Sequence, residues 1–240
     1  MRGFLELKKI KRTGLWPAVF GGGILSALIP ILNTAVRKEV FLQMEGSPLE
    51  IIMNENWQMM AMLNLLFVAA SACLLYHTEY GDNAIQRMNT LPQKESRMFF
   101  NKFFLLSAFC LIVLTIEGAG LAFSKVHWFL GEGRFLWEVL ANMGYAFVLL
   151  LPGVLFMLLI SAACKSMWIS LGIGVICIFT ATMLPTNHFV LSLFPFAMPF
   201  QIFAGAAESV VEKYMIAVGG EMILGILSAI TFFKIRRLFS

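Results

Sequence analysis

Two carboxylates lie inside long apolar stretches of this sequence, and they are its first candidates for chemistry. Glu117 interrupts the apolar run of residues 102–123, and Glu221 interrupts the run of residues 213–233. An ionisable group in a hydrocarbon environment is costly and therefore usually marks a functional position. Two interpretations stay open. Each acid pairs with a neighbouring backbone donor or Lys, or both line an outward-facing cavity as a substrate path for a cation.

The other residue types that support catalysis or metal binding are scattered. The three histidines fall near the ends of apolar runs or between them, namely His77, His127 and His188. The four cysteines lie within or at the ends of apolar runs without C-x-x-C spacing, namely Cys73, Cys110, Cys164 and Cys177. Because free cysteine is readily buried as a small apolar residue, packing is its expected role. We expect neither a metal cluster nor a redox pair.

The sequence also lacks the motifs of several enzyme classes. It contains no G-x-x-x-x-G-K-[ST] phosphate-binding loop, no H-E-x-x-H zinc motif and no G-x-S-x-G nucleophile elbow. We therefore expect no catalytic residue and no nucleotide bound by this chain. The absence of a motif in this chain places no limit on a partner subunit.

Composition predicts an all-α integral membrane protein. The 240 residues are 59% hydrophobic and 13% charged, and the mean hydropathy is +0.81, whereas soluble domains carry about 25% charged residues. About 20 apolar residues cross the hydrocarbon core as a helix. Windows of this kind predict six spans in one domain of residues 1–240, at about 15–36, 57–77, 102–123, 138–164, 166–184 and 213–233. Small residues at four-residue spacing, such as Gly23 and Ala27, predict close helix contacts.

The distribution of positive charge predicts the orientation of these spans. Counting a residue that opens a span with the segment before it, five of the 18 Lys and Arg residues belong to the segments after spans one, three and five, and the remaining thirteen belong to the termini or the alternate segments. Positive residues stay on the cytoplasmic side, so both termini are predicted to be cytoplasmic. The net charge of +4 follows from this topology and does not indicate nucleic acid. The basic start, MRGFLELKKIKR, predicts an interfacial helix before a retained first span.

A polar segment between predicted spans two and three stands out. It opens with capping residues near Glu79 and Asp82, and Ile85, Met88 and Leu91 follow at three-residue intervals until Pro92 ends the pattern. This predicts a short helix with a narrow apolar edge. The helix either lies on the membrane or docks into a groove on a cytoplasmic partner. Further along, Arg97 and Lys102 suit lipid phosphates at the interface.

The apolar segment between predicted spans five and six is interrupted by prolines. Pro185, Pro195 and Pro199 prevent one continuous helix there. Irregular backbone at membrane depth is tolerated only where it is buried in protein or lines a cavity. We interpret the segment either as irregular backbone that is buried in protein or lines a cavity, or as an ordinary, partly buried loop.

The polar segment resembles a loop of a known transporter family. The stretch EYGDNAIQRMNTLPQKESR, followed by a basic residue, is similar to the loop between spans two and three of type-2 ATP-binding cassette (ABC) permeases. The resemblance implies a coupling helix that contacts an ABC ATPase subunit, a second permease subunit, and re-entrant short helices between spans five and six. ATP and Mg would then bind to the partner. The implied contact residues are Glu79, Asp82, Ile85, Arg87, Met88, Leu91, Pro92 and Lys94.

Within that family, the length and the basic start resemble the lantibiotic-immunity permeases of bacterial cell membranes. The resemblance implies export of cationic antimicrobial peptides, although shared fold does not fix a substrate. Four acids in the first predicted outer loop suit either electrostatic steering of such a ligand or plain solvation. They are Glu39, Glu45, Glu50 and Glu55. Two alternatives remain: an ATP-independent peptide-binding immunity or scaffold protein, and an ion-coupled secondary transporter that uses Glu117 and Glu221.

Overall fold

The fold is a bundle of long helices. The computed structural model describes residues 14–80, 95–129, 135–164, 166–184 and 188–239. Its helices are α2 (Leu15–Val36), α3 (Lys38–Gln43), α4 (Pro48–Tyr80), α6 (Glu95–Trp128), α7 (Phe135–Ala163), α8 (Met167–Met183), α9 (Phe189–Ser192) and α10 (Glu208–Phe239), with one 3-10 helix, η2 (Met198–Phe200). No strand occurs in these residues, so the all-α prediction is confirmed.

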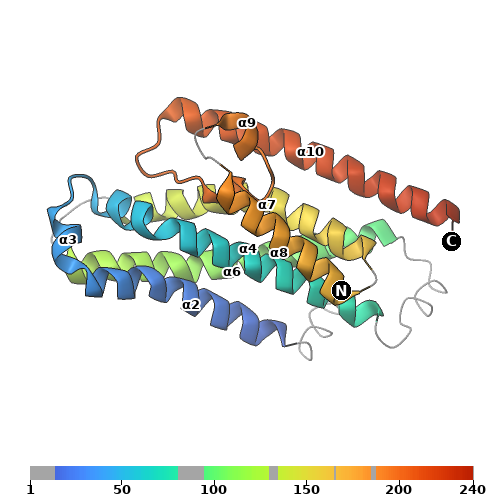
Figure 1. The fold of residues 1–240 in the computed structure, drawn as a ribbon, viewed down its shortest axis with the longest axis horizontal. Helices are drawn as coiled ribbons and strands as arrows, with labels where there is room; N and C mark the ends of the chain where they lie inside the picture. The colour runs from blue at the N-terminus through green and yellow to red at the C-terminus, as the bar shows by residue number, and fades with distance from the viewer. Residues whose placement is uncertain (1–13, 81–94, 130–134, 165, 185–187, 240) are drawn as a thin grey trace.

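The helices α4, α6 and α7 form the centre of the bundle. The helix α2 packs against α4 and α6, α8 packs against α4 and α7, and α10 packs mainly against α7. The helices α2, α4, α6, α7, α8 and α10 alternate in direction along the chain, and α2 begins toward the end at which α10 finishes (Figure 1). We call the end that carries α3 the outer end and the opposite end the inner end. These names follow the orientation predicted from charge.

Five of the six predicted spans are long and apolar enough to cross a membrane. They are α2, α4, α6, α7 and α10. The remaining helix, α8, is apolar but only 17 residues long, which corresponds to about 25 Å against a hydrocarbon core of about 30 Å. The chain after α8 continues into the broken segment of α9 and η2, so this part of the bundle is not a single continuous span.

The helices extend beyond the apolar windows at several ends. The predicted second span, 57–77, lies inside α4, which begins nine residues earlier at Pro48. Ser47 sets that start because its Oγ accepts a hydrogen bond from the Glu50 backbone N–H at 3.2 Å, as an N-capping residue does. The acids expected in one outer loop are therefore divided: Glu39 lies in α3, and Glu50 and Glu55 lie in α4.

Glycines allow α2 and α6 to approach closely. A Cβ added to Gly120 of α6 would lie 2.8 Å from the Ala27 carbonyl oxygen of α2. One added to Gly23 of α2 would lie 3.0 Å from the Ile116 side chain of α6. Small residues let helix backbones approach in this way. The close helix contact predicted at Gly23 and Ala27 is confirmed.

The proline-rich segment is confirmed as two short helices that pack on the bundle. Between α8 and α10, η2 contacts α4 and α7, and Met198 and Pro199 are buried. The indole Nε1–H of Trp57 in α4 donates to the Pro199 carbonyl oxygen at 2.9 Å. A buried backbone acceptor is therefore satisfied by the protein, as irregular backbone at membrane depth requires.

Candidate functional site: polar groups inside the bundle

The acid predicted in the third span lies at the junction of three helices. Glu117 of α6 is 0% exposed, and the Asn64 side chain of α4 donates from Nδ2 to Glu117 Oε2 at 3.1 Å. Ser26 of α2 lies beside the same carboxyl group. Glu117 Oε1 and Ser26 Oγ have no hydrogen-bond partner among the described residues. A substrate reaches Glu117 only if α2, α4 and α6 separate, because the carboxyl group has no exposed surface.

The acid predicted in the last span has different surroundings. Glu221 is half-buried on α10, which packs mainly on α7, and its Oε2 has no hydrogen-bond partner in the described part of the chain. Glu117 instead contacts α2 and α4. The described contacts do not join the two acids, which lie on different helices with different neighbours.

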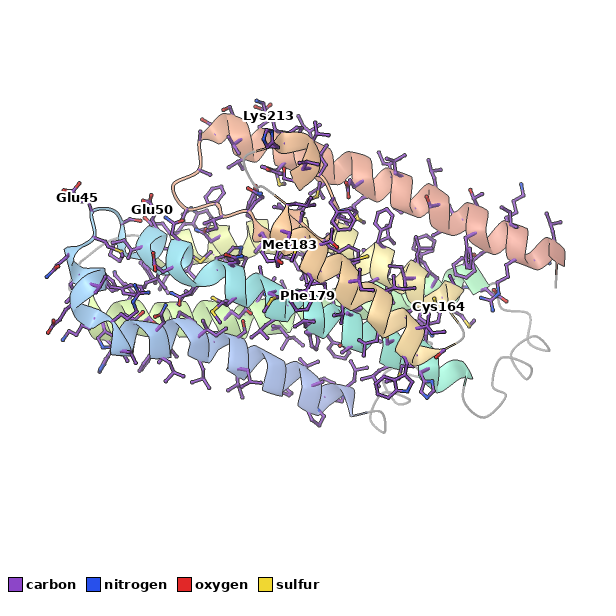
Figure 2. The ribbon with its side chains drawn as sticks, viewed as in Figure 1. Glu45, Glu50, Cys164, Phe179, Met183 and Lys213 are labelled. Carbon is purple, nitrogen blue, oxygen red and sulfur yellow. The ribbon has the colours of Figure 1, made fainter. Side chains whose placement is uncertain are left out.

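Two asparagine side chains and one ion pair join α2 and the residue after it to α4 at the outer end. Asn33 donates from Nδ2 to Asn56 Oδ1 at 2.8 Å, and Asn56 donates in turn to the Ile52 carbonyl oxygen at 2.8 Å. Nearby, Arg37 pairs with Glu55 at 3.3 Å on a partly exposed surface. Glu45 and Glu50 lie at this same end, far from Cys164 (Figure 2).

A buried lysine joins α6 to α4 at the inner end. Lys102 is 1% exposed, its Nζ donates to the Leu75 carbonyl oxygen at 3.0 Å, and the same atom lies 4.2 Å from the centre of the Tyr76 ring. The prediction that Lys102 meets lipid phosphates is therefore wrong. Lys102 stands in sequence between Phe99 and Phe103, both of which are buried, so it lies on the packed side of the helix.

A partly buried arginine of α10 contacts α6 and α7 at the same end. Arg236 of α10 donates to the Ala162 carbonyl oxygen at 3.2 Å, and it lies 3.9 Å from the Glu95 carboxylate. Ala162 is in the last turn of α7, where carbonyls lack an intrahelical partner. Glu95 is the first residue of α6. Sequence reasoning assigned Arg236 only to the positive side of the membrane.

A cluster of hydroxyl and thiol groups lies between α4, α7 and α8. Ser161 Oγ and Ser170 Oγ are 3.0 Å apart, and Cys73 Sγ lies 3.3 Å from Ser170 Oγ. All four cysteines are free thiols. This cluster borders a small cleft that Tyr76 and His77 also line. The arrangement links the three helices by hydrogen bonds.

The predicted coupling residues fall almost entirely beyond the described part of the chain. Glu79 is in the last turn of α4, and its side chain is not described. The others lie outside the described residues, namely Asp82, Ile85, Arg87, Met88, Leu91, Pro92 and Lys94. The basic start before Leu15 also lies outside them. The structure does describe the two helices that this segment connects, α4 and α6.

These features define a multi-pass helical membrane protein with polar ties between its helices. The sequence model of a family described as "ABC-2 family transporter protein" matches residues 4–181, which is 178 of the 240 residues. The chain belongs to this family and is a permease subunit that works with an ABC ATPase partner. No curated protein and no solved structure matches the chain. The matched range ends within α8, so α10 lies beyond it.

Proposed function

We propose that this permease subunit belongs to an exporter that moves cationic, lantibiotic-like peptides out of a bacterial membrane. Two permease subunits would act with two ATPase subunits, which bind ATP and Mg. The family match over residues 4–181 carries the proposal because it supplies the ATP-driven transport class. It favours this account over an ATP-independent immunity protein or an ion-coupled transporter.

Residues 79–94 are the proposed contact with the ATPase subunit. They connect α4 to α6 at the inner end, and Ile85, Met88 and Leu91 supply the apolar spacing that helix-in-groove recognition uses. Closure of the ATPase pair on ATP would move this segment. Both flanking helices belong to the centre of the bundle, so such a movement acts directly on α4 and α6.

The acids of the bundle support a cationic cargo. Glu39 and Glu45 are exposed at the outer end, whereas Glu55 is already paired with Arg37. Inside the bundle, Glu117 keeps one carboxylate oxygen without a partner among the described residues. A separation of α2 from α4 and α6 would present that group to a Lys-rich or Arg-rich peptide in a medium where charge attraction is strong. Glu117 and Glu221 remain the proposed substrate path.

Capture of the ATPase subunit tests the proposal first. The chain is co-expressed with the ATPase subunit encoded beside it, purified in detergent, and compared with a variant carrying Ile85→Asp, Met88→Asp and Leu91→Asp. We expect the native chain to capture the ATPase and the triple variant to lose it. A matched control places Asp at three exposed apolar positions of the outer end, namely Val36, Val126 and Leu136. Equal capture by all three proteins would refute the assigned contact.

Transport of a cationic lanthionine peptide into inside-out vesicles tests the substrate. We expect uptake that requires ATP and stops when the ATPase subunit carries an inactivating substitution. Glu117→Gln and Glu221→Gln should reduce it. Uptake that follows a proton gradient without ATP would favour the ion-coupled alternative, and full activity of both Gln variants would exclude the acids from the substrate path.

A further inference from the structure

The inner end of the bundle contains a tie between the two helices that flank residues 81–94. Lys102 of α6 reaches the Leu75 carbonyl oxygen of α4 at 3.0 Å and lies against the Tyr76 ring. Leu75 and Tyr76 precede Tyr80, the last residue of α4, by about one turn and a half at most. A buried ammonium is retained only where carbonyl oxygens and ring faces replace its water. Lys102 therefore holds α4 and α6 together where the connecting segment leaves them.

A second tie extends from the first residue of α6 to two further helices. Glu95 lies 3.9 Å from the Arg236 guanidinium of α10, and the same guanidinium donates to the Ala162 carbonyl oxygen of α7 at 3.2 Å. The planar fork of arginine can serve two acceptors at once. Arg236 thereby connects the start of α6 to the inner ends of α7 and α10.

We propose that Lys102 and Arg236 are positioning residues that transmit movement of the ATPase contact to the bundle, Lys102 by making α4 and α6 move as one unit and Arg236 by joining that unit to α7 and α10. We call the two ties, Lys102 with Leu75 and Tyr76, and Arg236 with Glu95 and Ala162, the inner clamp. The inference rests on the proposed ATPase contact at residues 79–94.

Two observations support transmission over a purely structural role. The clamp joins the inner ends of four helices, whereas α2, which packs against α4 and α6, has no described residue in it. Movement through the clamp would thus change the position of α7 relative to α2. In addition, the side chains of Arg236 and Glu95 are 32% and 39% exposed, and ion pairs at such positions contribute little to stability. Their loss should therefore leave a folded bundle.

The outer end offers a matched control. Arg37 pairs with Glu55 at 3.3 Å, with side chains 47% and 34% exposed. This pair also joins neighbouring parts of two elements, the end of α2 and α4, but it lies away from the ATPase contact. Arg37→Gln removes an ion pair of similar exposure without affecting the inner clamp.

The experiment measures a distance in the permease–ATPase complex in lipid nanodiscs. Spin labels are placed at Val36→Cys, at the end of α2, and Leu136→Cys, in the first turn of α7, both strongly exposed. The background carries Cys164→Ala and Cys177→Ala, since Cys73 and Cys110 are already buried. The distance is recorded without nucleotide and after trapping with ATP and vanadate. The proteins compared are the native clamp, Lys102→Met, Lys102→Arg, Glu95→Gln with Arg236→Gln, and Arg37→Gln.

We expect trapping to change the distance in the native complex and in Arg37→Gln. The change should fall at least about twofold in Lys102→Met and in the Glu95→Gln, Arg236→Gln protein, and Lys102→Arg should restore part of it. The double variant at the exposed pair tests the clamp even if Lys102→Met does not fold. A full distance change in that double variant, or none in the native complex, would overturn the clamp alone. Failure of the native chain to capture any ATPase would overturn the proposed function as well.

Discussion

The outer and inner halves of the bundle are held together in different ways. In the outer half, α2 and α6 touch through their backbones at Ala27 and Gly120, and short amides make the polar contacts, as between Asn33 and Asn56 at 2.8 Å. At the inner end, the described polar ties between helices include two long cationic side chains, Lys102 and Arg236, that reach carbonyl oxygens at 3.0 and 3.2 Å.

This difference separates a fixed region from an adjustable one. Close-packed backbones with short side chains have few alternative arrangements, because any displacement opens a void or creates a clash. Ties made by a few long side chains hold the joined helix ends together while those ends shift as a group. The adjustable ties lie where α4 and α6 meet residues 81–94, at the end to which an ATPase partner is proposed to bind. In the outer half, the closely packed helices would then move together as rigid groups.

The largest expected effect comes from breaking the fixed region. Gly120→Leu places a branched side chain where even a Cβ would lie 2.8 Å from the Ala27 carbonyl oxygen, and backbone cannot move aside as a side chain can. We expect a loss well above the 1–3 kcal/mol typical of overpacking, seen as little folded protein in size-exclusion chromatography. Gly144→Leu in α7 is the control because nothing lies within 4 Å of its added Cβ. Similar amounts of folded protein for the two variants would refute the close contact between α2 and α6.

The sequence predicts the helices of this bundle better than it predicts their ends. All six apolar runs are confirmed as helices, since lipid leaves backbone groups no other partner. The hydropathy windows stop where charge begins, whereas the helices continue through polar residues, as α10 does from Glu208 to Phe239. The start of α4 depended on Ser47 and Glu50, a capping pair that hydropathy does not detect.

The candidate site was predictable only in part. Glu117 was found because an acid is conspicuous in an apolar run, but its partner Asn64 lies 53 residues away in the chain and no local pattern relates the two. Lys102 was assigned to the wrong surroundings because its position near a span end resembles that of an interfacial lysine. Which face of a helix is buried depends on its neighbours, and single-sequence reasoning does not contain them.

The second expected effect concerns the buried polar pair of the outer half. Asn64→Leu removes the amide that donates to Glu117 Oε2 and leaves a fully buried carboxyl group with fewer donors. We expect a loss of about 1–3 kcal/mol in the free energy of unfolding, measured as a lower midpoint in thermal unfolding. In the double variant Asn64→Leu, Glu117→Leu much of the loss should be recovered, because no polar group then remains buried without its partner. Additive losses in the double variant would show that the two side chains act independently.

A smaller effect on stability is expected at the inner end. Lys102→Met keeps an unbranched side chain but removes the donor to the Leu75 carbonyl oxygen, a loss of about 1–3 kcal/mol that is partly offset because a buried charge is removed as well. We expect a thermal midpoint nearer to the native value than that of Asn64→Leu, together with the loss of nucleotide-dependent movement described above. If Lys102→Met instead unfolds as readily as Gly120→Leu, the inner tie is part of the fixed scaffold, and the distinction between the two halves is wrong.

The smallest effect is expected where the outer half carries its charge at the surface. Arg37→Gln removes the ion pair with Glu55 at 3.3 Å and a distant contact with the Phe41 ring at 5.9 Å. Because both charged side chains are partly hydrated, the loss should be about 0–1 kcal/mol and should shrink further in high salt. Asn56→Ala, which removes the buried amide contacts to Asn33 and Ile52, should cost more and should not respond to salt. The opposite order would mean that surface charge, and not buried packing, fixes the outer end.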